Sequence, residues 1–114
     1  MRRAPVVPDS QTNQPVLGRP AGTGEDAVGD VAAVHAALGE PARLVLVRLL
    51  ARHGSLCVRE LQAALPLAQP TVSHHLKVLR EAGLVEAERR GTWVYYRLRR
   101  EPLKRLLSHL VTLL

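Results

Sequence analysis

Two prolines only four positions apart, Pro66 and Pro70, constrain the fold of this 114-residue chain more than any other feature. Proline breaks a helix interior but is tolerated in a first turn. Pro66 therefore ends one short helix and Pro70 opens the next, which closes at Gly83. The second helix has a polar outer face, and its inward residues recur at helical spacing: Val72, Leu76 and Leu79. Two short helices joined by a tight turn predict a helix-turn-helix.

A β-hairpin is predicted directly after this motif. Residues 84–88 and 93–98 partly alternate apolar and polar side chains, and the second run is rich in β-branched and aromatic residues. The residues between them, 89–92, include Gly91 and predict the turn. A hairpin that follows a helix-turn-helix is a wing, so the predicted fold class is mainly α with a small β-hairpin, a winged helix-turn-helix.

Three further helices are predicted around this unit. Apolar residues recur at helical spacing in residues 25–38, and Gly39 supplies a stop. The next helix opens at Pro41, is apolar on most sides and closes at Gly54, which predicts a central buried helix. The last helix, opened by Pro102, has more leucine than a monomer of this length easily covers, which indicates packing against a second copy. Folding back onto its own core is the alternative.

The chain divides into a tail and one domain. Residues 1–24 hold four of the eight prolines and lack helical periodicity, which predicts a flexible N-terminal tail. Residues 25–114 are predicted to form a single DNA-binding and dimerisation domain. In residues 41–114, thirteen Lys and Arg residues outnumber five acids. A basic domain of this kind favours a polyanionic partner such as double-stranded DNA.

Residue types that the chain lacks exclude several function classes. The single cysteine, Cys57, rules out an internal disulfide and fits a reducing cytoplasm. No run of 18 apolar residues is present, so no membrane-spanning helix is expected. An enzyme is not expected, because no nucleophile–base pair, glycine-rich phosphate loop or paired carboxylates stand at usable spacing.

Four segments make the pattern specific: residues 38–44 (LGEPARL), 56–61 (LCVREL), 69–85 (QPTVSHHLKVLREAGLV) and 91–98 (GTWVYYRL). They resemble the ArsR/SmtB repressors, a metal-sensing family of bacterial winged-helix proteins, and the resemblance covers about residues 28–114. It implies a homodimer of α-α-α-α-β-β-α subunits joined through the first and last helices. It also implies binding to a palindromic operator and release when an inducer arrives.

The helix from Pro70 is the predicted DNA-reading element. With its apolar residues inward, the outward set near its N-terminal half is Thr71, Ser73, His74 and Lys77. Gln69, just before the helix, suits a bidentate contact to adenine. Arg89 and Arg90, at the wing tip, are placed to reach phosphate or the minor groove. The alternative is a solvated polar face.

Two positions depart from the family pattern. His74 stands where the family commonly has Arg, so a permanent cation is replaced by an imidazole. Ala68 stands where a hydroxyl usually caps this helix. Both changes predict altered affinity while the function is kept. His75, which the family shares, is expected to pack or bond within the domain.

The sequence says least about the signal that releases the protein from DNA. The arsenic-responsive members resembling this chain place two cysteines around a valine, and often a third one turn on. Here the three positions hold Cys57, Arg59 and Gln62. Because a thiophilic trivalent ion needs two or three thiolates, the arsenite or antimonite interpretation is weakened. Cys57 is then either a reactive single-thiol switch or an inert, half-buried thiol.

Zinc is the other candidate inducer. Zinc-type members use carboxylate and His ligands on the final helix, paired across the dimer, and Glu101 and His109 are the candidates here. They lie about 12 Å apart along a helix axis, so one chain cannot chelate with both. We therefore expect a DNA-binding repressor released by arsenite, antimonite or another thiol-reactive signal. The alternatives are a metal-independent or redox-responsive regulator and, less favoured, a protein–protein module without DNA binding.

Overall fold

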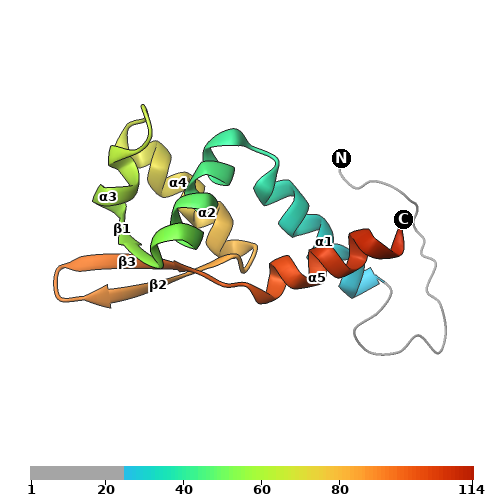
Figure 1. Cartoon of the computed structure of the whole chain (residues 1–114). Helices are drawn as coiled ribbons and strands as arrows, with labels where there is room; N and C mark the ends of the chain where they lie inside the picture. The colour runs from blue at the N-terminus through green and yellow to red at the C-terminus, as the bar shows by residue number, and fades with distance from the viewer. Residues whose placement is uncertain (1–24) are drawn as a thin grey trace.

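The computed structural model describes residues 25–114, so the tail predicted over residues 1–24 lies outside it. The elements follow one another as α1 (Glu25–Leu38), α2 (Pro41–His53), β1 (Ser55–Cys57), α3 (Val58–Ala63), α4 (Gln69–Glu81), β2 (Val85–Arg90), β3 (Trp93–Leu98) and α5 (Glu101–Thr112). In the described part, α2, α3 and α4 lie against a small antiparallel sheet, and α1 and α5 extend to the other end of the molecule (Figure 1). Over this range no helix combines the length and hydropathy needed to cross a membrane.

The predicted helix-turn-helix is confirmed as α3 and α4. The inward set of α4 is fully buried, with Val72, Leu76 and Leu79 at most 1% exposed. The helix begins at Gln69, one residue before the predicted start, and Pro70 lies in its first turn. Ala68 occupies the N-cap position with extended backbone angles and makes no side-chain capping hydrogen bond.

The wing has one strand more than the sequence predicted. β2 and β3 pair antiparallel up to Arg90 and Trp93, which leaves Gly91 and Thr92 as a tight turn. Gly91 has φ +64°, a left-handed conformation that suits glycine. β1 then adds to the free side of β3, so the order is β1-β3-β2. Three residues are too few to show alternation, which is why β1 gave no signal in the sequence.

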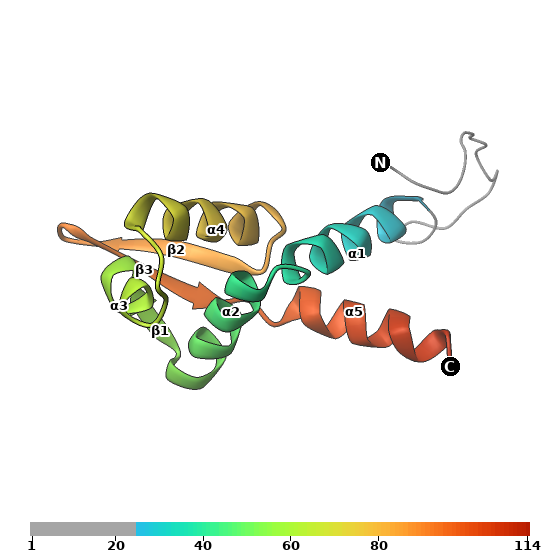
Figure 2. The same ribbon diagram turned by 90° about the horizontal axis from the view of Figure 1, so that it is seen from above.

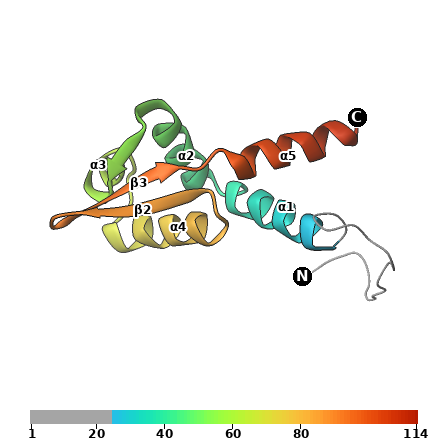
Figure 3. The same ribbon diagram turned by 90° about the horizontal axis from the view of Figure 1, so that it is seen from below.

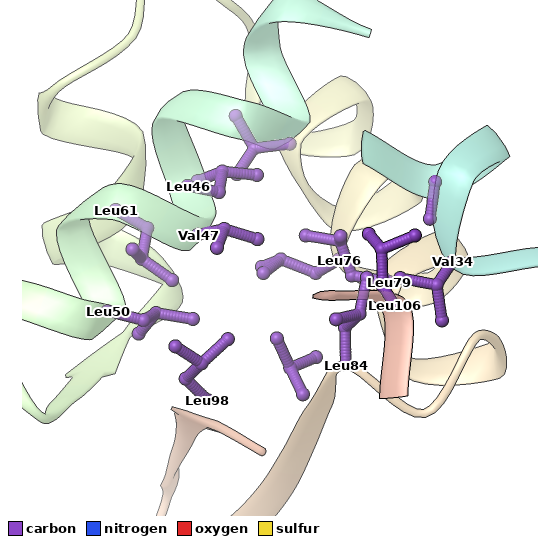
Figure 4. Packing of buried hydrophobic residues seen from close by; sticks show 13 residues of the cluster. Val34, Leu46, Val47, Leu50, Leu61, Leu76, Leu79, Leu84, Leu98 and Leu106 are labelled. Carbon is purple, nitrogen blue, oxygen red and sulfur yellow. The ribbon is translucent and has the colours of Figure 1, made fainter. Parts of the chain in front are cut away.

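The core is aliphatic, and α2 contributes Leu46, Val47 and Leu50 to it, although Leu44 of the helix predicted to be buried is 44% exposed. Leu46 and Leu50 of α2 are fully buried, and in Figure 4 they face the buried leucines of α3 and α4. Within residues 28–114 no polar or charged side chain is buried. Hydrophobic burial therefore accounts for the cohesion of the domain.

Helices α1 and α5 contact one another and extend away from the other elements (Figures 2 and 3). α1 buries Val34 and Ala37 but leaves Val28 56% exposed. α5 buries Pro102 and Leu106, and Leu103 is half-buried. The other large apolar residues of α5 are exposed, namely Leu107, Leu110 and Val111, and so are Leu113 and Leu114 just after it. The excess of leucine that the sequence indicated is thus left uncovered by the subunit itself.

Candidate nucleic-acid interface

The outer face of α4 is polar and accessible along its length. Every predicted DNA-contact residue on this helix is exposed: Gln69, Thr71, Ser73, His74 and Lys77. His74 and Lys77 lie away from the buried face of Val72, Leu76 and Leu79, and Thr71 and Ser73 flank it, because a helix repeats every 3.6 residues. Gln69 lies on the side of Leu76 and is exposed because it is the first residue of the helix. Arg80, one turn beyond Lys77, is also exposed and adds a cation that the sequence analysis did not include. Its spacing from Lys77 was the signal that would have found it.

The two wing arginines point to opposite faces of the sheet. Side chains alternate along a strand, so Arg89 shares its face with Val85, which is buried in the core beside α4. Arg89 is exposed and takes part in none of the ion pairs found in residues 28–114. It is therefore available on the side of the sheet where α4 lies (Figure 2).

Arg90 is engaged within the wing. Its guanidinium lies 3.1 Å from the Glu88 carboxylate and 3.4 Å from the Ser55 hydroxyl. It also lies 4.5 Å from the ring centroid of Tyr95, a cation–π contact. These partners hold Arg90 on the outer face of the sheet. Its predicted DNA contact stays a prediction, and it would require the side chain to leave three partners.

The same outer face has one further ion pair. Arg97 of β3 donates to the Glu86 carboxylate of β2 through Nε at 2.8 Å and also through Nη2. The hydrogen bond and the negative charge of Glu86 raise the pKa of Arg97 above its ordinary value. Arg97 is accordingly a permanent cation whose charge is already compensated, so it adds little to a DNA-binding surface.

Cys57 lies at the junction of the sheet and the helix-turn-helix. It pairs with Tyr95 across β1 and β3 and is 7% exposed. Its backbone N–H donates to the Glu60 carboxylate at 2.9 Å, which is the carboxylate half of a capping box at the start of α3. Arg59, in the position of the second cysteine of the resembling arsenic regulators, lies with its guanidinium 5.3 Å from the ring centroid of Trp93.

The candidate zinc ligands are not brought together within one chain. Glu101 is exposed at the start of α5 and His109 is half-buried in its last turn. Among the residues that the structure describes, no three His, Cys, Asp or Glu side chains are grouped to hold a metal ion. A site formed across two subunits stays a prediction.

The fold and the exposed face of α4 define a winged helix-turn-helix protein. Known proteins agree: residues 40–87 match the model of the bacterial regulatory protein, arsR family. A helix-turn-helix transcriptional regulator of Methanocaldococcus jannaschii is 41% identical over 68% of this chain and 86% of its own length. An arsenic resistance transcriptional regulator of Pseudomonas putida is 52% identical, but the match spans only 56% of this chain and half of that protein.

A solved structure extends the likeness to the whole domain. The homodimeric winged helix-turn-helix DNA-binding domain of a possible ArsR-family regulator from Mycobacterium bovis superposes with a TM-score of 0.67. It is 32% identical and covers 85% of this chain and 90% of its own. The chain therefore belongs to the ArsR family, and it is a DNA-binding transcriptional regulator.

Proposed function

We propose that this protein is a homodimeric repressor that reads a palindromic operator through α4 and the wing. The observation that carries the proposal is the two-sided character of α4, with Val72, Leu76 and Leu79 buried on one face and mainly polar side chains exposed on the other. A protein–protein module would be expected to present apolar side chains on this outer face, whereas the exposed side chains there are polar apart from Pro70. Because the operator is chromosomal DNA, this function implies a cytoplasmic location.

Each side chain has a role that its chemistry suits. Thr71 and Ser73 are short hydroxyls that can approach base edges in the major groove. Lys77 suits a phosphate or a guanine, and Gln69, in the first turn of α4, suits an adenine. His74 lies along the helix between Ser73 and Lys77. Arg89 is assigned to backbone phosphate or the minor groove beside the wing, and Arg90 to the same region as a secondary contact.

The dimer is assigned to α1 and α5. Together these two helices and the residues just after α5 carry most of the exposed large apolar residues, and Leu107 and Val111 are 63% and 58% exposed. A second copy covers such a surface most simply, because the symmetric pairing of identical helices satisfies both subunits. The M. bovis domain, which is a homodimer, supports this assignment. Leu107→Glu with Val111→Glu is expected to give monomers in analytical ultracentrifugation.

Binding to the promoter of its own gene and those of the neighbouring genes tests the proposal. The logarithm of the association constant should fall linearly with that of salt concentration, with a slope of about −0.9 per phosphate contacted. Lys77→Ala should weaken binding and flatten the slope, whereas the matched variant Lys104→Ala, on α5, should not. A flat salt response, or equal binding by both variants, would contradict operator reading by α4.

For the release signal, we propose a thiol-directed reagent, such as arsenite, antimonite or an oxidant, that acts at Cys57. The arsenic resistance regulator of P. putida supports this choice. So does the position of Cys57, since a group added to a thiol packed opposite Tyr95 would disturb the pairing of β1 with the wing. One subunit has a single thiol and cannot chelate such an ion by itself. The reagent must therefore react with one sulfur or bridge the Cys57 thiols of two subunits.

Release of operator DNA by arsenite, an oxidant and zinc should be compared in the wild type, Cys57→Ala and His109→Ala. Release by arsenite or oxidant that Cys57→Ala abolishes supports the thiol signal. Release by zinc that His109→Ala abolishes would assign the Glu101 and His109 site instead. No release by any of the three would favour the alternative, a metal-independent regulator.

A further inference from the structure

A polar cluster connects three helices at a point that the proposed DNA contacts do not use. Arg43, in the first turn of α2, donates through Nε to the Ala37 carbonyl at 2.7 Å and through Nη2 to the Ala36 carbonyl at 3.4 Å. These carbonyls belong to the last turn of α1, where helix carbonyls lack partners within the helix. Its Nη1 lies 3.2 Å from Nδ1 of His75, in the middle of α4. One guanidinium thus joins α1 and α4.

The chemistry of the two groups determines the state of His75. A guanidinium has only donors, so Nδ1 of His75 must be the acceptor of the Arg43 hydrogen bond. A neutral ring that accepts at Nδ1 carries its proton on Nε2. An imidazolium, with N–H on both nitrogens, would leave Arg43 without this acceptor. The contact therefore favours the Nε2–H tautomer over the Nδ1–H tautomer.

The surroundings of Nε2 agree with this assignment. Glu40 caps α2, and its Oε1 accepts from the backbone N–H of Ala42 at 2.7 Å and of Arg43 at 3.3 Å. The same Oε1 lies 3.9 Å from Nε2 of His75, so the proton on Nε2 is directed toward negative charge. The ring of His74 lies 5.9 Å away between centroids, on the exposed side of α4. The His75 side chain itself is only 12% exposed.

We propose that His75 is a positioning residue for operator recognition: through Arg43 it sets the position of α4 relative to the C-terminal end of α1. Its neighbours Ser73, His74 and Lys77 are assigned to DNA, so a shift of α4 would change their reach. Because α1 contacts α5 at the proposed dimer interface, the same link relates the spacing of the two recognition helices to that interface. The inference rests on the proposed operator binding, and it adds a residue that touches no DNA.

The first test determines the tautomer without DNA. Ring ¹⁵N and ¹³C chemical shifts of His75 in the full-length protein should report a protonated Nε2 and an unprotonated Nδ1 at neutral pH. Arg43→Gln should remove the preference between the nitrogens. A proton on Nδ1 in the wild type would overturn the proposal, whatever the protein does with DNA.

The second test separates an acceptor from mere packing. His75→Asn places an amide oxygen near the position of Nδ1 and is expected to bind the specific operator within about threefold of the wild type. His75→Leu keeps the volume and removes the acceptor, and it should lose about tenfold or more, because hydrogen bonds to charged groups are the stronger class. Binding to unrelated DNA should be equal in all three proteins, since it depends on phosphate contacts alone.

The double variant Arg43→Ala with His75→Leu completes the test. If the two residues act through one another, it should bind the operator no more weakly than Arg43→Ala alone. Additive losses, or His75→Leu binding as well as His75→Asn, would overturn the proposal. If the wild type binds no promoter DNA, the proposed function fails. Two measurements without DNA then still test the inference. They are the tautomer of His75 and the amide exchange in the last turn of α1, which should be faster in His75→Leu.

Discussion

The guanidinium of Arg59 lies over the ring of Trp93, 5.3 Å from its centroid. Arg59 is in α3 and Trp93 is the first residue of β3, next to the wing turn. The contact therefore ties the first helix of the helix-turn-helix to the tip of the wing. Trp93 is 44% exposed, so its role is to stack on a cation at the surface more than to fill the core.

Arg59 and Trp93 should show a measurable coupling free energy. Cation–π pairs at exposed sites stabilise by about 0.5–1 kcal/mol. We expect this value from a double-mutant cycle with Arg59→Gln and Trp93→Leu, measured by urea unfolding. Arg52→Gln, at an exposed position near the end of α2, is the matched control and should show no coupling to Trp93→Leu. Additivity of the first pair would mean that the stacking contributes nothing to stability.

Arg89 and Arg90 should differ in their effect on DNA binding although they are neighbours. Arg89→Ala should weaken operator binding and reduce the magnitude of the salt slope by about 0.9 per subunit, the value for one phosphate contact. Arg90→Ala should change the slope less, because its guanidinium already has Glu88 and Tyr95 as partners. Fluorescence anisotropy over a salt series measures both. Equal slopes for the two variants would show that Arg90 leaves its partners when DNA binds.

The difference between Arg89 and Arg90 shows what the sequence alone could not predict, which is contacts between residues far apart in the chain. Periodicity and prolines predicted the helices, the buried face of α4 and the hairpin, because these depend on neighbouring residues. The contacts of Arg90 with Ser55 and of Arg43 with His75 did not follow from any local pattern, since these partners are 35 and 32 residues away. β1 was missed for the same reason: its three residues form a strand only because β3 lies beside them.

A hydroxyl at the start of α4 should stabilise the domain. Ala68 has the extended backbone angles of an N-cap residue but no side-chain acceptor. Ala68→Ser should add a hydrogen bond to a first-turn N–H and raise the free energy of unfolding by about 1 kcal/mol. Differential scanning calorimetry should show a melting temperature about 4–8 °C higher. Ala63→Ser, at the exposed end of α3, provides the control and should not raise it.

His74→Arg should tighten operator binding at pH 8. A guanidinium keeps its charge at this pH and can bind phosphate or guanine through two donors. A gain of about threefold per subunit is expected for an exposed charge contact. His74→Gln, which is neutral at every pH, should not show it. Equal affinities of the wild type and His74→Arg in a titration at pH 8 would contradict a DNA contact at this position.

Arg59→Cys should confer a stronger response to arsenite than the wild type shows. It would place a second thiol two residues after Cys57, the spacing found in the arsenic regulators that this chain resembles. Because trivalent arsenic is held by two or three thiolates, a pair in one chain should bind it more tightly than the single thiol present now. We expect release of operator DNA at an arsenite concentration at least about tenfold lower.

Arg59→Ser also removes the contact to Trp93 but adds no thiol, so it separates loss of the wing contact from gain of a ligand. If Arg59→Ser and Arg59→Cys release DNA at the same concentration, the second thiol has no effect, and the first turn of α3 is not a site for arsenite in this protein.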